Sequence, residues 1–233
     1  MGYGFYGIDS YYIMLVLPAF LFSLYAQYKV RSTYNKFSRI ANRRGITGYD
    51  IARVILDRNG LHNVQVQAIP GELSDHYDPR TRVVRLSQGV FGSGSVAAIG
   101  IAAHETGHAI QHKAGYAPMA LRSTLVPAAN IGSMAGPYMA IFGLIFGWSF
   151  LTNLGLILFT IAVAFYLITL PVEFNASSRA VKAIESSGVL AYDEIEQAKK
   201  VLRAAAMTYV ASAAVAMASL LRLVLLANSR RDD

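Results

Sequence analysis

The sequence predicts a mainly α-helical membrane protein with about four transmembrane helices and a small α+β insertion after the first of them. Of its 233 residues, 54% are hydrophobic and only 15% are charged, which is too apolar for an ordinary soluble domain. Four stretches have the length and apolar character needed to cross about 30 Å of hydrocarbon. They are residues 11–28, 123–148, 150–172 and 204–227.

The first apolar stretch is expected to stay in the protein as an anchor. Its basic residues follow the apolar run instead of preceding it, and no small-residue cleavage site is evident, so it does not have the pattern of a signal peptide. The predicted segments are an anchor (1–28), a cytoplasmic domain (29–122), transmembrane helices 2 and 3 (123–172), a cytoplasmic helical segment (173–203) and a last transmembrane helix (204–233).

The second apolar stretch contains Pro127 and Pro137, and this leaves two structures open. The segment either spans the membrane as a kinked helix or forms a re-entrant pair of half-helices. Small residues recur every four positions, which predicts that another helix packs closely against this one. They are Ala128, Gly132 and Gly136, followed by Gly143 and Gly147.

The basic residues predict the orientation in the membrane. Six follow the first span directly and none precedes it, so the amino terminus is expected outside the cell. Regions 29–122 and 173–203 are then cytoplasmic, and they hold 13 and 5 of the 21 basic residues. This bias and contact with anionic lipid account for the net charge of +7. No nucleic-acid recognition motif accompanies these residues, so nucleic acid is not an expected partner.

The insertion is predicted to begin with a helix and a short β-hairpin. The helix covers residues 46–59, starts at Thr47 or Asp50 and ends at Gly60. Residues 64–68 alternate between apolar and polar side chains, and the turn-rich segment 70–81 leads to a second extended run.

A helix carrying an HExxH motif follows, from His104 to His108. Ser95 is a suitable N-cap, and Gly115 and Pro118 end the helical pattern. Residues four apart share one face of a helix, so both imidazoles can reach one Zn²⁺ while Glu105 contacts a zinc-bound water. The motif therefore predicts a zincin-like peptidase, whereas the alternative is a core helix that happens to carry histidines.

A catalytic zinc site needs a third protein ligand, and Glu173 is the predicted one. The downstream metzincin histidine is missing, and His112 lies on the same rigid helix roughly 12 Å from His104, so a structural or substrate-side role fits it better. Glu173 stands in the apolar setting LPVEFNASSRA, where a carboxylate is costly unless it is paired or bound to a metal. The alternative is a helix-end glutamate that faces lipid head groups or solvent.

The strand ahead of the HExxH helix is a candidate for binding substrate. In zincins this strand commonly lies open beside the cleft and takes up an extended peptide. The candidate residues are Arg82, Val83, Val84, Arg85 and Leu86, and an ordinary hairpin strand is the alternative.

Three segments, YDPRTRVVRLS, SVAAIGIAAHETGHAIQH and VEFNASSRA, resemble the YugP-like neutral zinc metallopeptidases of bacterial membranes. The resemblance spans most of the chain, and a more distant one connects it to the HtpX and CAAX-protease group of integral membrane gluzincins. It implies one zinc ion, a polypeptide substrate and a multi-pass protein of the bacterial cell membrane. The basic residues place the site on the cytoplasmic side, and the position of Glu173 just after the third apolar stretch favours a membrane-associated substrate.

The chain departs from the distant relatives at one position. In those relatives an aspartate four residues after the glutamate orients a zinc histidine, whereas here that residue is Ser177. Asn175, Ser178 and Arg179 are further candidates for orienting a ligand. Arg179 and Tyr116 are also candidates for stabilising the oxyanion.

The predicted reaction is hydrolysis of a peptide bond with Glu105 as general base. One alternative is an inactive membrane scaffold or adaptor that retains a metal site. Another is a transporter or channel, suggested by Arg222 within the last span and by the helix broken near Pro127 and Pro137. The alternative for Arg222 is pairing with a carboxylate or polar group of the helix bundle. The chain has no cysteine, which excludes disulfides and cysteine-bound metal.

Overall fold

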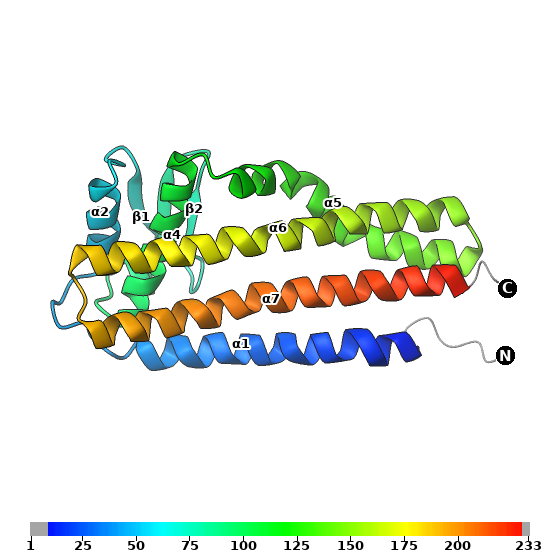
Figure 1. The fold of residues 1–233 in the computed structure, drawn as a ribbon, viewed down its shortest axis with the longest axis horizontal. Coiled ribbons are helices and arrows are strands. Elements are labelled where there is room, and N and C mark those ends of the chain that lie inside the picture. The colour runs from blue at the N-terminus through cyan, green and yellow to red at the C-terminus, as the bar shows by residue number, and fades with distance from the viewer. Residues whose placement is uncertain (1–8, 230–233) are drawn as a thin grey trace. The chain divides into compact units, whose positions relative to one another are not determined.

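The protein is mainly helical, with one small sheet (Figure 1). The structure, a computed structural model, describes residues 9–229. A π-helical turn, Tyr12–Val16, leads into the first helix. The further elements are α1 (Leu17–Phe37), α2 (Gly48–Arg58), β1 (Gln65–Ile69), β2 (His76–Asp78), β3 (Val83–Ser87), α3 (Gln88–Phe91), α4 (Val96–Lys113), α5 (Ala117–Phe146), α6 (Ser149–Ser187) and α7 (Tyr192–Ser229).

The chain forms two compact units, and several helices contribute residues to both. One unit, here called the apolar unit, contains residues 9–27, 121–170 and 208–229 of the described range. The other, here called the sheet unit, contains residues 28–120 and 171–207. The anchor predicted for residues 1–28 lies partly outside the described residues, because the description begins at residue 9.

Four helices among the described residues are long and apolar enough to cross a membrane. They include η1 continued by α1, and the helices α5, α6 and α7. Large apolar side chains point outward from the apolar unit, for example Met134 at 76% and Phe150 at 80% exposure. Such side chains are costly in water and suited to lipid. The predicted mainly α-helical membrane fold with a β-containing insertion is therefore confirmed.

Helix α5 is a single continuous helix with both prolines inside it. It bends along its length (Figure 1), as expected where a proline removes a backbone hydrogen bond. Gly132 and Gly136 lie against α6, and a Cβ atom placed on Gly136 would come 2.9 Å from Cβ of Phe159. Close helix packing at these glycines is thus confirmed, whereas Gly147 has φ +72° and nothing within 4 Å of its Cβ position.

Arg222 is paired within the apolar unit. Its Nη2 and Nε atoms donate to Oδ2 of Asp9 at 2.6 and 2.9 Å. Its guanidinium also lies 5.4 Å from the centre of the Tyr12 ring. A charged group in an apolar environment needs a partner of this kind, so the pairing interpretation of Arg222 is confirmed and its position gives no support to a transport role.

The sheet unit begins with the predicted capped helix. In α2 the Thr47 hydroxyl accepts a hydrogen bond from the Asp50 amide, and the Asp50 carboxylate accepts one from the Thr47 amide. Gly60 follows with φ +63°, a conformation that favours glycine and ends the helix. The apolar face of α2 packs against α4 through buried residues that include Ile51 and Ile55.

The sheet has the order β1–β3–β2, which corrects two details of the sequence interpretation. The predicted hairpin is present, but β2 and β3 form it, whereas β1 pairs with β3 in parallel. Strand β2 is only three residues long, too short for alternation to reveal it in the turn-rich segment.

The prediction that residues 82–86 form an open substrate-binding edge is wrong. Val83, Val84 and Arg85 have a strand partner on both sides, since β3 is central. Leu86 pairs with β1, and Arg82 precedes the strand with φ 55°. Backbone groups already used in a ladder cannot accept another strand, so the outer edges of the sheet belong to β1 and β2.

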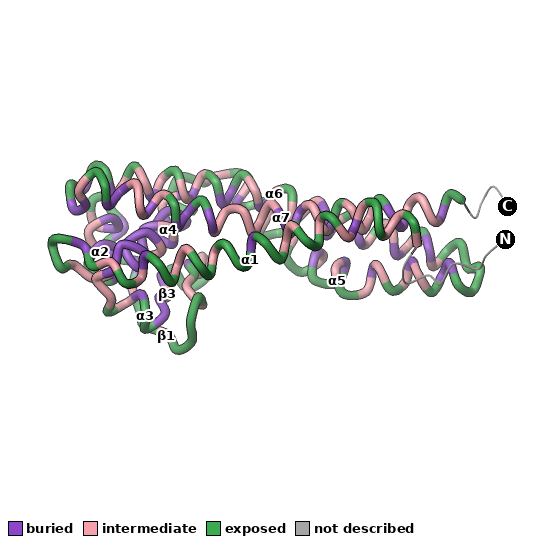
Figure 2. The backbone as a smooth tube through the Cα atoms, turned by 90° about the horizontal axis from the view of Figure 1, so that it is seen from below, coloured by how far each residue is buried: buried purple, intermediate pink, exposed green. Residues whose placement is uncertain are grey.

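Helix α4 forms the centre of the sheet unit and is buried over most of its length (Figure 2). Ser95 caps it by accepting a hydrogen bond from the Ala98 amide at 3.1 Å, and Gly115 with φ +60° follows its end, as predicted. Helix α6 does not end at Pro171 but continues to Ser187. Proline removes one hydrogen bond without forcing the helix to stop, and Glu173 consequently lies inside a helix.

Candidate metal centre

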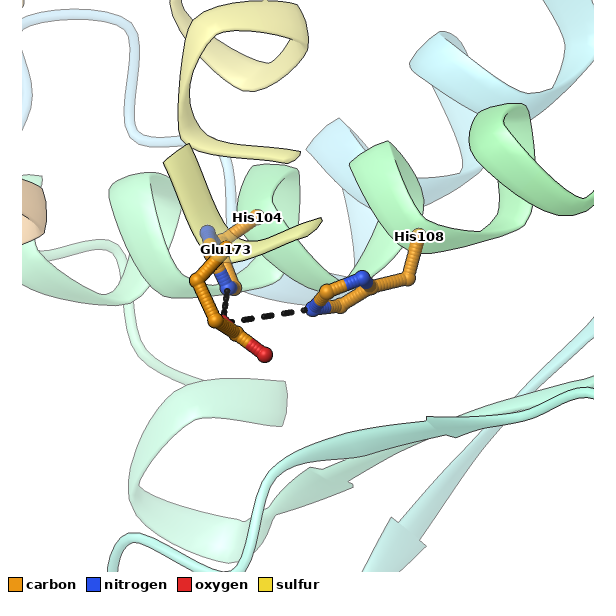
Figure 3. A group of neighbouring side chains, drawn as sticks. All are labelled: His104, His108 and Glu173. Atoms are coloured by element: carbon orange, nitrogen blue, oxygen red, sulfur yellow. Dashed lines mark hydrogen bonds and ion pairs between the residues drawn. The ribbon is translucent and has the colours of Figure 1, made fainter. Parts of the chain in front are cut away.

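Three predicted ligands meet between α4 and α6 within the sheet unit (Figure 3). Oε2 of Glu173 lies 3.1 Å from Nε2 of His104 and 3.6 Å from Nε2 of His108. All three residues offer a ligand atom, and these atoms lie within 4.8 Å of one another. In a tetrahedral site with bonds of about 2.0–2.1 Å, two ligand atoms are separated by about 3.3 Å. The observed separations are close to that requirement.

Each of the two histidines has a hydrogen-bond partner at Nδ1, the ring nitrogen that does not face Glu173. The Gln111 side-chain oxygen lies 2.9 Å from Nδ1 of His108 and can only accept, so Nδ1 donates to it and Nε2 is left to bind a metal ion beside Glu173. The hydroxyl of Ser177 lies 3.1 Å from Nδ1 of His104. Partners of this kind fix the ring orientation and tautomer that a metal ligand needs.

Gln111 is a functional residue that the sequence interpretation missed. It is fully buried, and its amide group donates to the Val172 carbonyl at 2.8 Å and to Oδ1 of Asn175 at 3.0 Å. One side chain thus ties His108 on α4 to the helix that carries Glu173. In the sequence, the only feature that could have identified Gln111 was its position seven residues after His104, on the same helix face.

Four of the five predicted supporting residues make contacts that can be compared, and these contacts differ. Ser177 bonds a ligand histidine directly, and Asn175 bonds Gln111. Arg179 donates from Nε to Oδ1 of Asn175 at 2.7 Å. The Tyr116 hydroxyl lies 3.5 Å from the Pro171 carbonyl. Ser177 therefore contacts His104 from the position four residues after Glu173, while its orienting role and the role of Arg179 or Tyr116 toward an oxyanion stay predictions.

Replacement of Gln111 should loosen the site. We expect Gln111→Leu, which keeps a similar volume but removes the acceptor for His108, to weaken zinc binding about 10–100-fold. Zinc affinity measured by competition with a chromophoric chelator checks this. Gln197→Leu on α7 is a control in the same unit, and an equal loss in both variants would contradict a specific role of Gln111.

Gly107, inside the motif, permits the close approach of the two helices. A Cβ atom at this position would lie 2.6 Å from the carbonyl oxygen of Ala176, well inside van der Waals contact. Any larger residue would separate α4 from α6 and therefore the histidines from Glu173.

Gly107→Ala should accordingly weaken zinc binding by about tenfold or more, because overpacking costs about 1–3 kcal/mol and every 1.4 kcal/mol is about tenfold. Gly100→Ala on the same helix is the matched control, since its Cβ would meet Cβ of Ala198 at an ordinary 3.4 Å. Isothermal titration with zinc distinguishes the two variants. Unchanged affinity in Gly107→Ala would show that α6 can shift without disturbing the site.

The electrostatics of the centre favour a cation. Glu173 is 2% exposed and His108 8% exposed, so the carboxylate needs a partner. Burial by itself lowers the pKa of His108, but the carboxylates of Glu173 and Glu105 outweigh it and raise the pKa above its usual value. Without metal, the site therefore attracts a proton. A divalent cation would balance the negative charges of Glu173 and Glu105 more strongly than a proton does. Two imidazoles and one carboxylate are a donor set that suits zinc.

Glu105 and His112 lie on the same helix as the ligands but outside the three-residue group. Glu105 is 8% exposed. Nδ1 of His112 shares a 2.8 Å hydrogen bond with the Tyr77 hydroxyl of β2, and the choice between a structural and a substrate-side role for His112 stays a prediction. Next to this pair is a cavity of about 350 Å³, whose lining includes Arg82 and Lys113.

Comparison with known proteins agrees with this geometry. The family described as "Putative neutral zinc metallopeptidase" matches residues 12–228. The chain is 46% identical over 222 residues to "Putative membrane protease YugP" of Bacillus subtilis (strain 168), covering 95% of this chain and 99% of the relative. No solved structure matches significantly. Because the family match covers nearly the whole chain, including His104, His108 and Glu173, the protein belongs to the neutral zinc metallopeptidase family of membrane proteins.

Proposed function

We propose that the protein is a zinc metalloendopeptidase of the gluzincin type that hydrolyses polypeptides at the cytoplasmic surface of the membrane. The observation that supports this most is the convergence of His104, His108 and Glu173, with Glu105 between the two histidines on the same helix. Neither histidine needs to move to meet Glu173, so the donor set is preorganised for one ion.

Bound zinc would polarise the scissile carbonyl and lower the pKa of water in the site. Glu105 is then the group that accepts a proton from the attacking water as its oxygen bonds to the carbonyl carbon. When the carbon–nitrogen bond breaks, Glu105 returns that proton to the leaving amine. The small exposure of this carboxylate limits competing solvent, which suits proton transfer to a substrate atom.

A direct assay tests the activity. The purified full chain, loaded with zinc in detergent, should cut an unstructured peptide at internal bonds, and mass spectrometry identifies the products. A chelator should stop cleavage, and added zinc should restore it. Zinc-loaded protein that binds the metal tightly but cuts no peptide under any lipid condition would instead favour a scaffold that retains a metal site.

The cytoplasmic location is proposed from the distribution of charge. The basic cluster follows the first apolar helix, and both His104 and His108 lie within region 29–122. Glu173 comes directly after the apolar stretch 150–172, so the site is proposed to lie close to the membrane surface and to favour membrane-associated substrates.

Labelling of single cysteines measures this orientation. In right-side-out membrane vesicles, an impermeant maleimide should modify a cysteine at Gly4 and not one at Ser74, which lies between β1 and β2. Gly4 lies outside the described residues. The natural chain has no cysteine, so each label reports one position. The reverse labelling pattern would place the site outside the cell.

A further inference from the structure

A cationic cavity of about 480 Å³ lies between α1 and α7 in the sheet unit and shares no residue with the metal centre. The two helices run side by side in the ribbon of Figure 1 and in the tube of Figure 2. Helix α1 contributes Lys29 and Lys36, and α7 contributes Lys200 and Arg203. Each pair has a spacing of three or seven residues, which places its members on one helix face.

None of these four cations forms an ion pair with another residue of the described range 9–229. Among residues 9–229, no carboxylate lies within 4.0 Å of their charged atoms. The carboxylate of Glu196 is close enough for electrostatic attraction to Lys200 and Arg203. It accepts its hydrogen bond, however, from Nζ of Lys199 at 2.8 Å. Two facing helices usually present apolar residues to one another, so four positive charges around one cavity indicate a place for an anion.

The cavity also has hydroxyl donors and an apolar lining, both of which suit an anion that carries hydrocarbon chains. Ser32 and Thr33 lie between the two lysines of α1, and Met207 lies one turn beyond Arg203. Lys29 directly follows the apolar stretch 11–28, and the apolar stretch of α7 begins directly after Arg203. Both helices therefore change from polar to apolar at the cavity, as at the boundary between lipid head groups and acyl chains.

We propose that this cavity binds the head group of an anionic phospholipid. The phosphate would accept hydrogen bonds from the lysines, from Arg203 and from the hydroxyls of Ser32 and Thr33. The acyl chains would lie along the apolar side of α7 near Met207. Basic pockets between helices on the cytoplasmic side are suited to such head groups. This inference does not depend on the proposed peptidase activity.

Native mass spectrometry tests the proposal on the full chain. The detergent-solubilised protein, incubated with equal amounts of phosphatidylglycerol and phosphatidylcholine, should retain phosphatidylglycerol in preference. The variant Lys29→Gln, Lys36→Gln, Lys200→Gln and Arg203→Gln should reduce that retention about tenfold or more, because each cation near an anionic surface contributes to binding. Exchange of the lysines for arginine and of Arg203 for lysine should preserve it.

The control removes the same charge elsewhere in the sheet unit. Arg31, Arg39, Arg44 and Arg80 are exposed, lie outside the cavity lining and are replaced together by glutamine. This control should keep the preference for phosphatidylglycerol, and both variants should keep zinc and helical circular dichroism. Equal loss in both variants would show general charge attraction and overturn the site. Displacement of the lipid by millimolar inorganic phosphate would overturn it as well, since a free anion would then suffice.

Discussion

Glu105→Gln is expected to retain zinc and to lower kcat/KM for peptide cleavage by about 10²–10⁴-fold. The substitution keeps the size and shape of the side chain while removing its ability to take a proton. Glu105 is absent from the group of residues that converge on the metal position, so loss of its charge should leave the ligand set intact. Steady-state kinetics, together with metal analysis of the same preparation, measure the two effects separately.

Glu72→Gln is the control for that experiment, because it removes one exposed carboxylate of the sheet unit from a loop between strands. It should leave activity within about twofold, as surface substitutions usually have small effects. A zinc-loaded Glu105→Gln protein with substantial turnover would refute the assignment of the general base. It would leave the metal centre itself standing, since the ligands are other residues.

The second large effect is expected from the ligands. His104→Ala, His108→Ala and Glu173→Ala should each reduce zinc affinity by more than the roughly 10–100-fold that follows loss of a ligand's hydrogen-bonding partner. Only two protein donors remain in each variant, which is too few for a stable site with an open position. Inductively coupled plasma mass spectrometry after dialysis measures the metal content, and activity should fall in parallel.

His112→Ala provides a sharp comparison, because His112 continues the histidine spacing of four along α4 but bonds Tyr77 instead of the metal centre. It should keep one zinc per chain. If Glu173→Ala also bound zinc like the natural chain, another group would have to be the third ligand, and the 3.1 Å approach of Glu173 to His104 would reflect only an ion pair.

The sequence predicted the candidate metal ligands of the site but not the hydrogen bonds that hold them in place. The HExxH spacing placed two imidazoles on one helix face, and the isolated carboxylate in LPVEFNASSRA pointed to Glu173, because both arguments rest on local helix geometry and on the cost of a charge in an apolar setting. The supporting bonds could not be read in this way. Gln111 reaches Asn175, 64 positions later in the chain, and only the packing of α4 on α6 makes that contact.

In the sheet, too, the sequence predicted the local structure but not which strands lie next to each other. Alternation in 64–68 and the extended run after residue 81 located β1 and β3, since side chains alternate between the faces of a strand. Their order in the sheet depends on partners distant in sequence, and the short β2 enters as the second neighbour of β3. An edge strand and a central strand of this length have similar sequences, so the substrate-edge prediction for 82–86 was wrong.

By itself the sequence determined the four long apolar helices, the capped ends of α2 and α4, and the three candidate metal ligands, because membrane thickness, helix periodicity and capping act within one segment. The tertiary structure alone decided that α6 continues beyond Pro171, that Gly107 allows the backbone of α6 to approach, and that Gln111 and Ser177 orient the histidines. Those features depend on which helix faces meet, and neighbouring helices supply the packing energy that local preferences cannot specify.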